Sequence, residues 1–157
     1  LRQGRTWLVP DDDSAEAELH ALFERLTVEA EPGDARCEIN GRMIPCRRQA
    51  EGVIWFDFEA LCEGPRAVAD YIELARDFHT VLLSGLPQMD VNRDNAARRF
   101  VHLVDEFYDR AVNLVVAAAV PIPEIYIGER LRHEYERTSS RLIEMQSEDY
   151  LGREHRP

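Results

Sequence analysis

The 157-residue sequence contains no lysine, and all 19 of its lysine and arginine positions are arginine. This absence excludes chemistry that needs an amine, such as a Schiff base or the lysine of a phosphate-binding loop. The glycine-rich loop that normally carries that lysine is missing as well. These residues alone are therefore not expected to cradle nucleotide phosphates.

Long apolar runs and an excess of positive charge are also absent. No run approaches the roughly 18 apolar residues of a membrane span, and the chain does not open on a secretory signal. The net charge of −11 disfavours nucleic acid and anionic membranes, because both attract clustered cations. We expect a soluble, cytoplasmic protein with no nucleic-acid partner and no membrane span.

Cysteine is scarce, with three residues. Asn40 and Gly41 form a strong two-residue hairpin turn, whose register sets Cys37 opposite Ile44. Cys46 is then a diagonal neighbour of Cys37 at about 7 Å or more, at or beyond the limit for a disulfide. We expect three reduced, buried thiols.

No His or Cys pair has the spacing of metal ligands, so no metal site is predicted.

What the sequence does contain is a strand, a helix and a second strand. Residues 80–84 and 113–120 are nearly continuous apolar runs, which is typical of strands covered on both faces in a parallel sheet. Between them, apolar residues such as Phe100 and Phe107 recur at helical spacing. A crossover of this length joins parallel strands. The fold class is therefore predicted to be α/β with a parallel strand-helix-strand core.

The whole chain, residues 1–157, is short enough to form one unit. Its first part, 1–57, is predicted to hold an opening strand, a helix and a β-hairpin, and its second part, 58–157, the core and a long C-terminal helix. The expected elements are an opening strand to residue 8, a helix at 15–27, hairpin arms at 36–40 and 42–48, a strand at 53–57, a helical turn at 124–127 and the last helix at 129–147. The missing initiator Met indicates that the chain starts partway through a larger protein.

Arg137 and Arg141 are the strongest candidate site residues. They lie one helical turn apart, where like charges repel unless an anion lies between them. That anion is either Glu144, in which case the arginines brace the helix, or a phosphate from outside, because guanidinium groups match phosphate oxygens. Both alternatives stay open from the sequence.

Other candidate chemistry is weaker. Asp105 with Glu106 imitates the acidic strand end that holds Mg²⁺, but the apolar spacing around the pair is helical. Asp57 ends a better strand, yet no phosphate-binding loop accompanies it, so a strand-end or helix-cap role is expected. Neither Cys62 with His79 nor Ser84 with a histidine lies in a recognised catalytic sequence.

The strings that surround these residues resemble the C-terminal half of the ZapE-type AAA ATPases, which include bacterial cell-division proteins and mitochondrial relatives. The resemblance covers nearly the whole chain. It is carried in order by FDFEALC (56–62), DYIELA (70–75), FHTVLL (78–83), ARRF (97–100) and ERTSSRLIEMQS (136–147).

The resemblance implies an AAA-like fold and a parent protein that hydrolyses ATP with Mg²⁺ as an oligomer. It also implies that the phosphate-binding loop and the Mg²⁺-binding strand lie in a missing N-terminal half, and that bacterial members associate with the tubulin-like protein FtsZ. Arg137 and Arg141 would then stabilise phosphate charge in the full protein, and this chain alone would not hydrolyse ATP. The alternative is a non-catalytic module that docks a division or proteolysis partner. Ala117 departs from the pattern, since a small polar residue is expected there.

Overall fold

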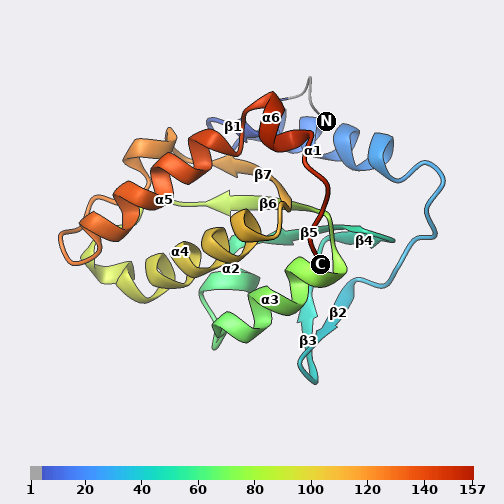
Figure 1. Cartoon of the computed structure of the whole chain (residues 1–157), viewed down its shortest axis with the longest axis horizontal. Coiled ribbons are helices and arrows are strands. Elements are labelled where there is room, and N and C mark those ends of the chain that lie inside the picture. The colour runs from blue at the N-terminus through green and yellow to red at the C-terminus, as the bar shows by residue number, and fades with distance from the viewer. Residues whose placement is uncertain (1–4) are drawn as a thin grey trace.

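The computed structural model describes residues 5–157. They form a five-stranded sheet with helices on both faces and a separate two-stranded hairpin (Figure 1). The elements in chain order are β1 (Trp7–Leu8), α1 (Asp13–Leu26), β2 (Arg36–Ile39), β3 (Arg42–Pro45), β4 (Arg48–Ala50), β5 (Val53–Asp57), α2 (Phe58–Cys62), α3 (Val68–Asp77), β6 (Thr80–Leu86), η1 (Val91–Arg93), α4 (Asp94–Asp109), β7 (Asn113–Ala118), η2 (Ile122–Glu124), α5 (Arg132–Glu144) and α6 (Glu148–Leu151).

The large sheet has the strand order β1-β7-β6-β5-β4, and its first four strands are parallel. Leu82 at its centre is in register with Trp55 on one side and with Val115 on the other. The short strand β4 closes the far edge in antiparallel pairing with β5. The α/β class and the parallel strand-helix-strand core are therefore confirmed.

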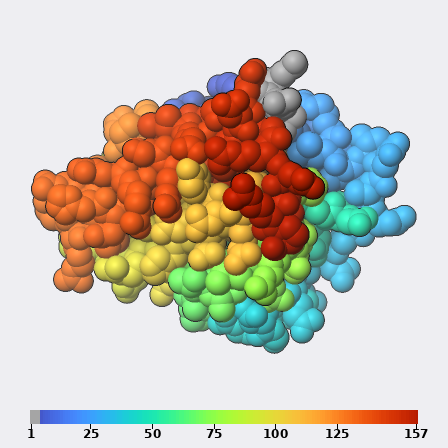
Figure 2. Space-filling view, viewed as in Figure 1, coloured from blue at the N-terminus to red at the C-terminus, as the bar shows by residue number. Residues whose placement is uncertain are grey.

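The two faces of the sheet are covered unequally. Helix α1 alone packs on one face, where Leu19 and Phe23 join a core with Trp55 and Val115. The other helices and the hairpin cover the opposite face, which holds the larger core. In Figure 1, α4 and α5 lie side by side in front of the sheet, and Figure 2 shows that α5 and the C-terminal segment form much of that surface. This layering places the last long helix against α4.

The hairpin of β2 and β3 is fastened to α3 by the buried carboxylate of Asp70. Asp70 is 1% exposed and accepts hydrogen bonds from both the Arg42 guanidinium, at 2.6 and 2.7 Å, and the Asn40 amide, at 3.0 Å. The backbone N–H of Ala67 also donates to it, at 2.9 Å. Burial raises the pKa of Asp70, but these hydrogen bonds outweigh burial, so the net pKa lies below the ordinary value.

Asp70 should make folding stability depend on acid pH. A carboxyl group whose pKa is lower in the folded state contributes stability above its unfolded pKa of about 3.9, and that stability disappears as pH falls through the folded value. Thermal unfolding between about pH 6 and pH 3 measures the effect. Asp70→Asn should flatten this slope relative to the parent chain. An equally steep slope in Asp70→Asn would show that other carboxylates carry it.

The hairpin register matches the sequence prediction, with Cys37 opposite Ile44. All three cysteines are free and buried. Burial raises the pKa of the Cys37 thiol to about 11 and that of the Cys62 thiol to about 12. Because the thiolate is the reactive form, these cysteines are poor nucleophiles.

Several boundaries differ from the sequence predictions. The second hairpin arm, predicted at 42–48, ends at Pro45. The chain then leaves the hairpin, and Arg48 begins β4, which pairs with β5 in the large sheet. The turn expected at 124–127 is instead the 3-10 turn η2, followed by a bridge between Tyr126 and Met89. The helix predicted at 129–147 is α5, which is shorter than predicted, and a separate short helix, α6, follows with Ser147 as its N-cap. The opening strand is confirmed for Trp7–Leu8, while residues 1–4 lie outside the described range.

Within residues 5–157, no helix combines the length and the apolar character that crossing a membrane requires.

Candidate functional site

Arg137 and Arg141 lie on the side of α5 that is next to α4. Helix α5 packs into the core through a stripe of buried side chains, Tyr135, Thr138 and Leu142. The two arginines lie beside this stripe. The side chain of Arg137 is 58% exposed and that of Arg141 is 27% exposed. The two guanidinium groups therefore differ in how freely they can meet a molecule from solution.

One carboxylate, Asp105 on α4, lies between the two arginines. Arg141 Nη1 is 2.5 Å from Asp105 Oδ1, and Arg137 Nη2 is 3.6 Å from Asp105 Oδ2. Glu144, the anion considered from the sequence, instead accepts a hydrogen bond from Tyr108 Oη at 2.7 Å and pairs with Arg153 at 3.4 Å. The pairing of Arg141 with Glu144 was therefore wrong, and the bracing anion comes from another helix.

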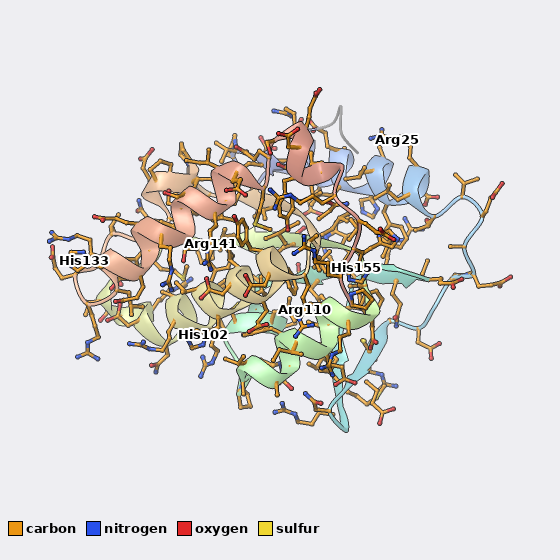
Figure 3. The ribbon with its side chains drawn as sticks, viewed as in Figure 1. Arg25, His102, Arg110, His133, Arg141 and His155 are labelled. Carbon is orange, nitrogen blue, oxygen red and sulfur yellow. The ribbon has the colours of Figure 1, made fainter. Side chains whose placement is uncertain are left out.

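An aromatic ring supports Arg141. Its guanidinium carbon lies 4.9 Å from the centre of the Tyr108 ring, a favourable cation-π distance. Tyr108 in turn stacks on the buried Tyr150, with ring centres 5.9 Å apart. Figure 3 shows Arg141 where α5 passes α4. Arg141 is thus supported by a pair of stacked aromatic rings as well as by Asp105.

The arrangement can bind an anion. A guanidinium carries five N–H donors, and Asp105 engages only part of each set. The remaining donors of Arg137 face solvent, so a phosphate or carboxylate can approach them. Sequence reasoning missed Asp105 and Tyr108 as partners. The available signal was that Asp105 stands among polar positions at helical spacing, but only tertiary packing brings it to α5.

A second polar cluster lies at the carboxyl ends of β5 and β6, where α/β sheets commonly bind ligands. Arg47 reaches across it and binds Glu16 of α1, Asp57 at 3.3 Å and Ser84 at 3.3 Å. Ser84 also accepts a hydrogen bond from Trp55 Nε1 at 2.9 Å. Asp57 is thus a strand-end residue, as predicted, and ion-paired to Arg47. The cluster ties α1 to the sheet.

This edge does not fit the phosphates of ATP. A hollow of about 380 Å³ adjoins Ser84 and Gly85, and Asp57, Glu59 and Arg66 line it as well. The Arg66 guanidinium already donates to the backbone carbonyls of Ala60 and Pro65. Burial raises the pKa of the nearby Asp11, with further help from Glu16. Arg47, the central cation, is already neutralised by internal carboxylates. The field at this edge therefore opposes a polyphosphate.

The remaining candidates are not brought together as catalytic groups. Cys62 lies against Tyr71, whereas His79 contacts Thr80 and His155. Asp105 and Glu106 lie on helix α4 and not at a strand end. Ala117 is buried in the core under α1. Across residues 5–157, no three His, Cys, Asp or Glu side chains gather in a way that could hold a metal ion.

Comparison with known proteins gives consistent matches. The family model described as AFG1-like ATPase matches residues 1–154. The chain is 44% identical over 155 residues to the cell division protein ZapE of Escherichia coli K12, which covers 99% of this chain and 41% of that protein. It is 29% identical over 181 residues to lactation elevated protein 1 homolog B of Danio rerio, covering 94% of this chain and 36% of that protein. The chain thus spans well under half the length of these relatives. No solved structure matches it.

Proposed function

This chain belongs to the AFG1-like ATPase family, and on that premise we propose that it is the C-terminal region of an ATPase whose phosphate-binding loop and Mg²⁺-binding strand lie outside it. The coverage of 41% of the E. coli relative leaves room for those parts. The sequence supports the proposal as well, because it offers no lysine and no phosphate-binding loop to cradle the phosphates of ATP.

The observation that carries this proposal is the arginine pair on α5. Arg137 and Arg141 are two guanidinium groups on one helix face, held by a carboxylate that leaves further N–H donors available. Arginines placed in this way stabilise the negative charge that spreads over the transferred phosphoryl group. When ATP is bound, its γ-phosphate supplies that charge. In this proposal both arginines serve a site completed by residues outside the chain.

The cellular role that we propose is in bacterial cell division. The identity of 44% with a protein named for cell division supports it. The family resemblance of residues 136–147 and the other strings supports FtsZ as the partner and a cytoplasmic homo-oligomer as the working form. In an oligomer, the arginines of one subunit can reach nucleotide bound to its neighbour.

A non-catalytic protein-binding module is the second candidate. The observation that favours it is the close contact of Arg141 with Asp105, which is also what a purely bracing arginine would make. The two candidates differ in one respect: only the first requires ATP turnover to depend on these arginines.

The 157-residue chain alone should not hydrolyse ATP. It has no lysine and no phosphate-binding loop to hold the β- and γ-phosphates with Mg²⁺ for in-line attack. Phosphate release from purified chain should equal that of a denatured control, whereas the complete protein should turn over ATP. Turnover by the chain that persists through further purification would contradict the proposal.

A further inference from the structure

Among residues 5–157, Asp105 is the one acidic group that pairs with both candidate arginines. Its two oxygens divide between them, Oδ1 at 2.5 Å from Arg141 and Oδ2 at 3.6 Å from Arg137. The Asp105 side chain is 23% exposed, so solvent screens this contact less than it would screen a fully exposed pair. Asp105 therefore links the two guanidinium groups, closely to Arg141 and more loosely to Arg137.

Asp105 contacts the two arginines at different distances, and this difference assigns them different roles. Arg141 is the more buried one, is bound closely by Asp105 and lies over the Tyr108 ring. Arg137 is 58% exposed and bound at the longer distance. Arg141 is thus fixed in place, while Arg137 can exchange its contact with Asp105 for another anion at low cost.

Without Asp105, the two guanidinium groups would lose the carboxylate between them, while Arg141 would keep its contact with the Tyr108 ring. Arg137 and Arg141 lie one turn apart on α5, where like charges repel each other. Glu144, the next acidic residue on the helix, is already engaged by Tyr108 and Arg153. Neutralising Asp105 would leave Arg137, the more exposed guanidinium group, free to adopt many rotamers, and ordering it again would cost entropy in each catalytic cycle.

We propose that Asp105 is a positioning residue that, together with Arg141, holds Arg137 ready to meet the phosphoryl group of a bound nucleotide. Arg137 is then the guanidinium that contacts phosphate, and Asp105 acts through it. This inference rests on the function proposed above. It assigns a role to a residue of α4 that the arginine motif on α5 does not contain.

The test is a double-mutant cycle on ATP turnover in the complete ATPase. Asp105→Asn, which keeps the shape and removes the charge, should lower kcat by about ten-fold and change KM for ATP by less than about two-fold. Asp105→Glu should recover most of the loss. In an Arg137→Ala background, Asp105→Asn should lower kcat by less than about two-fold further, because residues that act as one unit are not additive.

Asp109→Asn is the matched control, since it removes one charge from an exposed position a turn further along α4. A normal kcat in Asp105→Asn beside a low kcat in Arg137→Ala would overturn the positioning role and leave the proposed function standing. Additive losses that follow the melting temperature would also overturn it, in favour of a structural contact. Normal kcat values in both arginine variants would remove the arginine role and this inference together.

Discussion

Replacing Arg141 or Arg137 with alanine in the complete ATPase is expected to lower ATP turnover by about ten-fold or more. Loss of a phosphate-stabilising arginine can cost about 10³-fold, and in the proposed arrangement Arg137 contacts the phosphate while Arg141 helps to hold Arg137 in place. The fold should remain intact, since both side chains lie beside the packed stripe of α5 and not within it. Steady-state phosphate release, measured beside the melting temperature, checks the prediction.

Lysine should rescue both positions poorly. It keeps the charge but loses the planar set of donors that matches phosphate oxygens. Arg132→Ala is a suitable control on the same helix, because Arg132 is 60% exposed and pairs with the neighbouring Glu129 at 3.5 Å. Turnover in the Arg137 and Arg141 variants that falls only in step with melting would return both residues to a bracing role.

Trp55→Ala is expected to destabilise the fold by about 3–5 kcal/mol, the usual cost of removing a large buried aromatic side chain. Trp55 is 0% exposed and is the central contact between β5 and α1. Its ring centre lies 4.5 Å from that of His20 and 4.8 Å from the Arg47 guanidinium carbon. Urea unfolding of the 157-residue chain, followed by circular dichroism, measures the loss.

Trp55→Phe separates packing from hydrogen bonding at the same position. It keeps most of the apolar contact but removes the N–H that donates to Ser84. Its cost should therefore fall clearly below that of alanine. A loss below about 1 kcal/mol for Trp55→Ala would show that α1 contributes little to the core, contrary to the layering described here.

The core was predictable because its pattern is local. Buried parallel strands need apolar residues on both faces, so the runs that form β6 and β7 stand out in the sequence. The crossover helix α4 is recognisable too, because its apolar residues recur at helical spacing. The hairpin register followed from the turn at Asn40 and Gly41, which both adopt positive φ angles.

The predictions failed at positions where contacts between distant parts of the chain determine the structure. β4 is three residues long and becomes a strand only because β5 offers it an edge. Helix α5 begins at Arg132 and not at residue 129, and no side-chain cap at Leu131 marks that start in the sequence. The partner of Arg141 was missed for the same reason, since Asp105 lies 36 residues away on another helix. Helix spacing identifies neighbours within a helix and says nothing about those across a helix interface.

The most direct test of the central claim is kcat for the double variant Arg137→Ala/Arg141→Ala of the complete ATPase, at saturating ATP and beside its melting temperature. If this chain supplies arginines to a nucleotide site completed elsewhere, kcat should fall at least about ten-fold while the melting temperature stays near that of the Arg132→Ala control. A kcat equal to that of the control, in a folded protein, would contradict the claim.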